Sequence, residues 1–242
     1  MPLYVASRKA LMGAPSTLFD GLVAYWKLNE ASDGSGAVTR ADATGRGNTL
    51  TDNNTVPSAA GLVYSNALSH NRVDNDFLSV VDNSDVSVGN VDWTGALWLY
   101  PTNITACRWP MGKGNYDAYA TLEWGFDIAS SKVLLRAGNN GGGETTVTAT
   151  TLGNLSNNTW YLVIAWHDAA GDTINICVNA GAADSAACTH GLYDSTQAFR
   201  IGSDGSGRNW EGRIGPAMLW KRVLNAGERA ELYAGGAGVQ LF

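Results

Sequence analysis

The chain has 242 residues, of which 16% are charged, and about a fifth are glycine (29) or asparagine (20). Its hydrophobic content of 45%, with 9 Trp, 9 Tyr and 5 Phe, excludes a disordered chain, and the many turn-forming residues favour β-structure. The net charge of −6 argues against nucleic-acid binding, and the longest uncharged apolar stretch, 160–166, is too short to cross a bilayer.

Residues 1–20 are predicted to form an arm before the folded domain, because they show neither a helical nor a strand period. Arg8 and Lys9 follow the short apolar run of this arm, which is the reverse of the order in a signal peptide. We therefore expect that the general secretion route does not export the chain. The apolar side chains expected to dock on a partner are those of Leu3, Tyr4, Val5 and Leu11.

Short apolar runs follow the arm and alternate with clusters of Gly, Asn, Asp and Ser, which is typical of an antiparallel sandwich or barrel. One helix is predicted near the C-terminus, where Asn225 and Glu228 have the spacing of a capping box and 235–236 is a glycine pair that would end the helix. The predicted strands are 22–28, 77–81, 96–100, 120–128, 132–138, 145–151, 159–167, 172–179, 198–203 and 210–220.

Two of these strands differ in the polarity of their faces. The strand 159–167 is apolar on both faces, which predicts an inner strand covered on both sides. The strand 120–128 alternates apolar residues with Glu, Gly and Asp, which predicts one solvent-exposed face. The tetrapeptide DGSG occurs at 33–36 and again at 204–207, between strands, and both copies are predicted to be turns.

Four segments of the chain carry a resemblance to a known family. The run 22–51 holds AYWKLNE followed by DATGRGN, and 76–101 holds FLSVVDNSD. Residues 158–181 begin with NTWYLVIAWHD, and 199–233 run from FRIGSDGSG to ERAELY. In this order the segments resemble the laminin-G-like jelly-roll domains of the concanavalin A-like lectin/glucanase superfamily.

The resemblance covers about residues 22–236 and implies an all-β fold, a two-sheet antiparallel jelly-roll sandwich with one short C-terminal helix. We therefore expect a single domain over 21–236, preceded by the arm 1–20 and followed by a C-terminal tail, 237–242. The fold alone does not decide the function, because it hosts many.

The resemblance also implies a possible site for a structural calcium ion. In some relatives such an ion connects the early D-x-(S/T)-G loop to the closing strand. The residues that would hold it here are Asp42, Gly45 and Asn48. The chain has Gly215 and Pro216 where relatives often carry an acidic pair, which removes oxygen donors that calcium prefers. The alternative is a tight loop capped by its own Asp and Asn side chains. No cofactor is otherwise required.

A disulfide between Cys177 and Cys188 is geometrically possible. If the hairpin that contains them turns on 181–184, the two cysteines face each other across neighbouring strands. Such a bond would require an oxidising environment.

Sugar binding is the activity that the loops favour, because aromatic rings stack on pyranose faces while amides and charged groups bind hydroxyls. Loops at one rim of a rigid sandwich are suited to such a site. Trp210, in contrast, falls on a structural aromatic position of the family and is expected in the core. The candidate glycan-binding residues are Trp109, Asn115, Tyr116, Tyr119, Asn139, Asn140 and Arg208.

No catalytic residue is predicted. A glycosidase needs two carboxylates roughly 5–10 Å apart, whereas Glu123 and Asp127 lie four residues apart on one strand face, or about 13 Å. This pair is therefore interpreted as part of a solvated or turn-facing edge of the sheet.

The first functional hypothesis is a non-enzymatic structural or adhesion protein on the virion surface of a bacteriophage, as a capsid decoration or tail accessory. The arm would bind capsid or tail neighbours, the chain would form a homo-oligomer or part of a larger assembly, and the loop rim would contact surface glycans. The alternative is a secreted, extracellular carbohydrate-binding or adhesion module, and a glycoside hydrolase ranks third. Neither membrane insertion nor nucleic-acid binding is expected.

Overall fold

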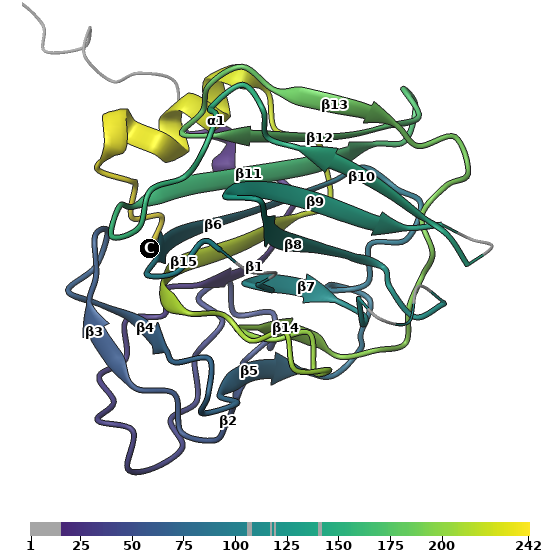
Figure 1. Ribbon diagram of the computed structural model, residues 1–242. Coiled ribbons are helices and arrows are strands. Elements are labelled where there is room, and N and C mark those ends of the chain that lie inside the picture. The colour runs from purple at the N-terminus through teal and green to yellow at the C-terminus, as the bar shows by residue number, and fades with distance from the viewer. Residues whose placement is uncertain (1–15, 106–107, 117, 119, 140–141) are drawn as a thin grey trace, which may run out of the picture.

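The computed structural model describes residues 16–105, 108–116, 118, 120–139 and 142–242 (Figure 1). The predicted docking residues of the arm, Leu3, Tyr4, Val5 and Leu11, lie outside the described residues. So do Tyr119 and Asn140 of the predicted glycan site.

The first of two antiparallel sheets has eight strands. Along one path its strands are β13 (Asp184–Ala187), β12 (Thr173–Val178), β11 (Tyr161–Asp168), β6 (Trp93–Pro101), β15 (Gly212–Trp220), β4 (Asn66–His70) and β3 (Ser58–Ala60). The eighth strand, β1 (Leu22–Trp26), pairs with the second half of β15, while β4 pairs with the first half. The register of β15 shifts between Ile214 and Ala217, and this bulge accommodates Pro216 inside a paired strand.

The second sheet has seven strands, which lie one below another in Figure 1, from β10 at the top to β2 at the bottom. They are β10 (Glu144–Thr148), β9 (Lys132–Gly138), β8 (Trp124–Ala129), β7 (Met111–Lys113), β14 (Phe199–Ile201), β5 (Phe77–Val80) and β2 (Thr51–Asn53). The two sheets confirm the predicted jelly-roll sandwich. All ten predicted strands are present, and the five that were missed, β2, β3, β4, β7 and β13, are short and rich in small or polar residues.

The main core fills the space between the sheets. Trp93 and Trp124, from opposite sheets, have ring centroids 4.6 Å apart, and Trp26 stacks on Phe199 at 5.0 Å. Trp210 is fully buried in the same cluster, as predicted. Large aromatic side chains thus provide much of the buried apolar area that stabilises the sandwich.

A second apolar cluster covers the outer face of the eight-stranded sheet. It includes Trp166 of β11 and Leu232 of the helix α1 (Ala226–Tyr233), the one α-helix among the described residues, and the Arg229 guanidinium of α1 lies 4.3 Å from the Trp166 ring centre. Strand β11 is therefore buried on both faces, which confirms the prediction for it. The predicted capping box of α1 is present, but the left-handed backbone that ends the helix begins at Ala234, one residue before the glycine pair.

The segments on both sides of the predicted domain pack against it. A short 3-10 turn, Thr17–Phe19, buries Leu18, whose carbonyl oxygen accepts a hydrogen bond from Trp220 Nε1 at 2.7 Å. Leu241 of the tail is buried, and the ring of Phe242 meets that of Phe19 with centroids 5.4 Å apart. Residues just outside the predicted domain 21–236 are therefore packed against it at both ends.

The disulfide that the sequence left possible between Cys177 and Cys188 is absent from the structure. Strands β12 and β13 pair in a register that puts Ile176 opposite Asp184, so Cys177 does not face Cys188. Their side chains belong to different apolar clusters, one outside and one inside the sandwich, and both cysteines are free. Burial raises the pKa of both thiols, that of Cys177 to about 11.

Within the described ranges, no helix is both long enough and apolar enough to span a membrane.

Candidate functional site

One row of side chains crosses the outer face of the whole seven-stranded sheet. Its members alternate along each strand with core residues such as Leu78 and Trp124, so the row points away from the core. From one edge of the sheet to the other, the paired residues are Thr51, Ser79, Arg200, Gly112, Gly125, Arg136 and Thr146.

Trp109 fills the middle of this row. A Cβ atom at Gly112 or Gly125 would overlap its indole, so the ring lies directly on the backbone of β7 and β8. Trp109 is 0% exposed. The prediction that this ring stacks on a sugar is therefore wrong, because the two glycines leave a space that the indole itself occupies. Trp109 separates the outer face into two polar regions.

The first region surrounds Arg136. Its Nε lies 2.8 Å from Asp127 Oδ2 and its Nη1 lies 2.9 Å from Glu144 Oε1. The guanidinium of Arg136 lies 4.4 Å from the ring centre of Tyr116, and that of Arg208 lies 3.6 Å from it. The structure thus brings Tyr116 and Arg208 together, and two guanidinium groups contact the Tyr116 ring.

The charges of this region are largely compensated. Burial raises the pKa of Asp127, although the hydrogen bond and charge of Arg136 act in the opposite direction. Burial lowers the pKa of Arg136, but the hydrogen bond and charge of Asp127 outweigh it and leave that pKa raised. Asn115 lies half-buried beside Tyr116 in the chain. Asn139 accepts a hydrogen bond from Thr145, so its side chain caps its own loop.

The second region contains a pocket of about 390 Å³ over β14 and β5, on the other side of Trp109. Arg200 is the one ionisable side chain among its described lining residues. The others provide an aromatic ring, side-chain amides, hydroxyls and glycine backbone. The lining residues are Asn54, Asn75, Phe77, Arg200, Ser203, Gly205, Ser206 and Gly207.

The loop after β14 determines what Arg200 contacts. Arg200 Nη1 donates to the backbone oxygen of Asp204 at 3.2 Å. The Asp204 carboxylate is turned into its own DGSG loop, where Oδ1 accepts from the backbone N–H of Ser206 at 2.8 Å and of Arg208 at 3.2 Å. Burial lowers the pKa of Arg200, although the charge of Asp204 opposes this. An arginine nevertheless stays charged, so the pocket is cationic.

The two asparagines of the pocket present complementary groups. Asn54 donates from Nδ2 to the backbone oxygen of Asn75 at 3.0 Å, which leaves its Oδ1 as an acceptor. Asn75 accepts from Asn209 at 2.6 Å through Oδ1, which leaves its Nδ2 as a donor. Both residues are exposed, whereas Phe77 is half-buried on the sheet face. Donor, acceptor and ring therefore converge on one hollow.

Sequence reasoning missed the residues of this pocket. Arg200 and Phe77 lie on short strands in which outward-facing residues alternate with core residues. Nothing in this pattern distinguishes them from ordinary surface positions of a strand. The available signal was the DGSG loop at 204–207, directly after a strand that carries an outward arginine.

A family model described as the concanavalin A-like lectin/glucanases superfamily matches residues 75–228. The chain belongs to this superfamily. Among curated proteins, none matches the sequence.

Solved structures share the fold of this concanavalin A-like domain. The binding domain of Paraclostridial Mosquitocidal Protein 1 aligns with a TM-score of 0.65 at 16% identity, over 90% of this chain and 52% of that one. The botulinum neurotoxin serotype G binding domain aligns with a TM-score of 0.67 at 14% identity, over 88% of this chain and 50% of that one. The chain spans about half the length of these toxin domains. A third structure is domain 4 of AbnA, a GH43 extracellular arabinanase from Geobacillus stearothermophilus, in complex with arabinotriose. It aligns with a TM-score of 0.63 at 15% identity, over 86% of this chain and 96% of that one.

The loop predicted to hold calcium in this concanavalin A-like domain is held by its own hydrogen bonds. Asp42 Oδ1 accepts from the backbone N–H of Thr44 at 3.0 Å, and Asp42 Oδ2 accepts from that of Asn48 at 3.1 Å. Asn48 donates from Nδ2 to Val23 and Asp85, and Gly45 donates to the Asp42 carbonyl oxygen. N–H groups therefore donate to both oxygens of the Asp42 carboxylate, as in the alternative of a tight loop capped by its own side chains. Calcium binding stays a prediction.

The carboxylates considered for hydrolysis are buried, so the prediction of a solvated face is wrong. Glu123 and Asp127 are both 0% exposed. Glu123 Oε2 lies 2.8 Å from Lys113 Nζ, and Glu123 Oε1 accepts from the backbone N–H of Gly89 at 3.0 Å. Burial raises the pKa of Glu123 despite the charge of Lys113. Each carboxylate could be buried because the fold supplies a cation beside it.

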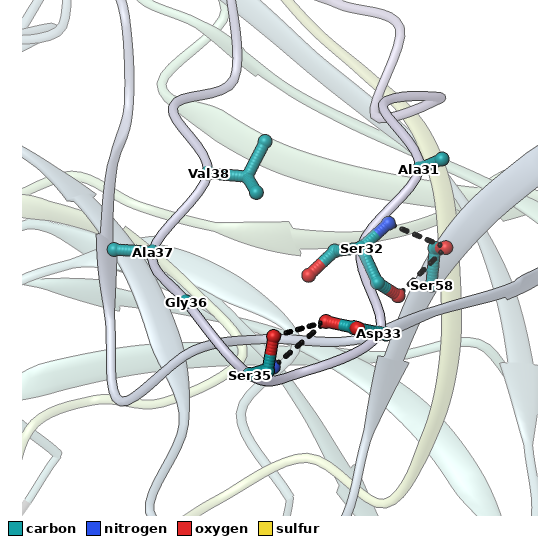
Figure 2. A pocket seen from close by; sticks show the side chains of 8 residues that line it. All are labelled: Ala31, Ser32, Asp33, Ser35, Gly36, Ala37, Val38 and Ser58. Atoms are coloured by element: carbon teal, nitrogen blue, oxygen red, sulfur yellow. Dashed lines mark hydrogen bonds between the residues drawn. The ribbon is translucent and has the colours of Figure 1, made fainter.

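A hollow of about 500 Å³ lies within the loop 31–38 (Figure 2). Its polar groups serve the loop itself. Asp33 Oδ1 accepts from Ser35 N and Ser35 Oγ, and Ser32 is hydrogen-bonded with Ser58, as the dashed lines in Figure 2 show. This hollow offers a ligand no aromatic ring and no cation among its described lining residues, unlike the pocket at Arg200.

Proposed function

We propose that this concanavalin A-like domain is a carbohydrate-binding module, and that a sugar residue occupies the pocket lined by Phe77 and Arg200. The observation that supports the proposal most directly is the composition of this pocket. One ring, two side-chain amides and one guanidinium converge on a hollow large enough for a sugar residue.

The groups suit a pyranose or furanose ring. A sugar has an apolar C–H face, which packs on an aromatic ring such as Phe77, and hydroxyl groups around its edge. A hydroxyl both donates and accepts hydrogen bonds. Asn54 Oδ1 and Asn75 Nδ2 would serve these two roles, because their other amide atoms already bind the protein.

The comparisons support the proposal at the level of class. The AbnA domain is described in complex with arabinotriose, and the two toxin structures are described as binding domains. Because identity is 16% or lower, these likenesses show the fold, and the assignment of a ligand rests on the pocket.

A glycan array tests the proposal with the full chain and three variants. We expect the unmodified protein to bind at least one oligosaccharide. Phe77→Ala should weaken that binding by about tenfold or more, because the packing surface is removed. Asn75→Ala should also weaken oligosaccharide binding, although it leaves the Phe77 ring in place. Phe19→Ala is the control, since Phe19 is a 47% exposed phenylalanine in the 3-10 turn Thr17–Phe19 and does not line the pocket.

Thermal unfolding of each variant shows whether it is folded. Binding to no glycan on a broad array by the unmodified chain would overturn the proposal. So would binding that neither Phe77→Ala nor Asn75→Ala affects, because the sugar would then lie elsewhere. Release of shorter products from an oligosaccharide would show a hydrolase instead.

A virion-surface role is a finer proposal about where such binding acts. It rests on the arm residues Leu3, Tyr4, Val5 and Leu11, which would dock on a capsid or tail neighbour while the outer sheet face stays accessible. Deletion of residues 1–15 should then abolish incorporation into particles and leave a folded domain. Unchanged incorporation would contradict it and favour an extracellular module.

A further inference from the structure

We propose that the pocket at Arg200 selects acidic sugars, with the guanidinium of Arg200 binding the carboxylate of a uronic or sialic acid residue. This inference rests on the proposed function, because it names the class of sugar that the same pocket takes.

The first step is the charge of the pocket. Arg200 is its one ionisable side chain among the described residues, so no carboxylate of the lining repels an anion. The chain as a whole has a net charge of −6, and a cationic pocket on such a protein is a local exception. An anionic group on a sugar would therefore find a favourable local potential in this pocket.

The second step is the state of the guanidinium. Other arginines on this face are paired with acids: Arg136 with Asp127, and Arg208 with Asp204 at 3.9 Å. For Arg200, the part of the chain that the structure describes provides no carboxylate within ion-pair distance, and its hydrogen bond goes to a backbone oxygen. Nε and Nη2 remain as a fork of donors, which matches the two oxygens of a carboxylate.

The third step is why the nearest acid does not pair with it. The turn after β14 holds the Asp204 carboxylate by hydrogen bonds from Ser206 and from the backbone of Arg208. Gly205, with φ of +82°, brings its backbone against the Arg200 guanidinium without adding a side chain. The turn thus fixes both the acid and the cation and keeps them apart.

The other DGSG turn provides an internal comparison. Asp33 accepts from Ser35 as Asp204 accepts from Ser206, and Gly34 has φ of +80°. No arginine lines the hollow beside that first turn among its described residues, so the same tetrapeptide forms an ordinary turn there. The distinguishing element of the second copy is Arg200 on the strand before it.

The test uses pairs of oligosaccharides on an array: each glucuronate-, galacturonate- or N-acetylneuraminate-terminated glycan beside its methyl ester, with sulfated and neutral glycans added. The full chain should bind at least one carboxylate member and bind its ester about tenfold or more weakly, because a charge-assisted hydrogen bond is lost. This comparison within the unmodified protein needs no variant to fold.

Two variants locate the effect. Arg200→Gln should weaken binding of the acid by about tenfold or more and leave the ester unchanged, and Arg200→Lys should restore part of the binding, since it keeps the charge without the fork. Arg213→Gln is the matched control, because Arg213 also lies on a strand and donates from Nη1 to a backbone oxygen, that of Ala60. It should bind like the unmodified chain.

The outcomes separate the two proposals. Equal binding of acid and ester, preference for neutral or sulfated glycans, or an unchanged acid preference in Arg200→Gln would overturn acid selection. If the chain binds neutral glycans and Phe77→Ala abolishes this binding, the proposed function stands and only the selection of acidic sugars is overturned. Binding to no glycan would overturn both.

Discussion

The indole of Trp109 lies in the space that a side chain at Gly125 would occupy. This contact closes the centre of the outer sheet face and leaves the pocket at Arg200 on one side and the Arg136 region on the other.

We expect Gly125→Ala to destabilise the fold by about 1–3 kcal/mol, because its Cβ would overlap the indole. Trp109→Ala should cost about 3–5 kcal/mol through the cavity that it leaves. In the Trp109→Ala background, Gly125→Ala has room and should cost much less, so the two changes are coupled. Denaturant unfolding measures all four proteins of this cycle. Additive free energies of unfolding would show that the two groups do not compete for this space.

The ion pair of Lys113 and Glu123 is expected to be essential for stability. Both side chains are fully buried, and Lys113→Met would leave the Glu123 carboxylate without its cation. A change of this kind costs about 3–5 kcal/mol. Arg46→Gln is the control, because Arg46 pairs with Asp85 but is half exposed, and an exposed pair contributes below about 1 kcal/mol. Similar denaturation midpoints for the two variants would contradict the burial of the Lys113 pair.

Glu228 should make stability depend on pH in acid. The hydrogen bonds of Arg222 lower its pKa from 4.5 to about 2 in the folded protein. Because the folded pKa is depressed, the stabilisation is complete above pH 4.5 and is lost as the pH falls toward about 2. The difference in unfolding free energy between the unmodified chain and Glu228→Gln should therefore shrink through this window.

Glu231→Gln is the control for that experiment, since Glu231 is exposed on the same helix. Its effect should stay within about 0.5 kcal/mol. A Glu228→Gln difference that is constant from pH 6 to pH 2 would contradict the Arg222 contact.

The cysteines offer a chemical check of the register of β12 and β13. Without reductant, iodoacetamide should label neither Cys177 nor Cys188 in the native protein, because both are buried and burial raises their pKa. In denaturant, still without reductant, both should be labelled, as peptide mass mapping would show. Failure of both to react in denaturant until a reductant is added would reveal a disulfide.

Sequence reasoning recovered the features that depend on local pattern. The ten predicted strands follow from apolar periodicity, and the Asn225 capping box follows from residue types three positions apart. Both need information from only a few neighbouring residues, and this is why they could be predicted.

Features that depend on long-range packing were predicted less well. Trp109 and Asp127 were predicted to face solvent. The sequence does not reveal that Gly125 leaves room for the Trp109 indole, or that Arg136 compensates the buried Asp127 carboxylate. The pocket was missed for the same reason. Phe77 and Arg200 are 123 positions apart and become neighbours only when β5 pairs with β14.

The most direct measurement of the central claim is a ¹H–¹⁵N NMR titration of the full chain with a pool of neutral and acidic monosaccharides: arabinose, galactose, glucuronate, galacturonate and N-acetylneuraminate. We predict saturable shifts of the backbone amides at 54, 75, 77 and 203–207, the residues around the pocket. Shifts confined to 31–38 or to 108–116, or no shifts at all, would contradict a sugar site at Phe77 and Arg200.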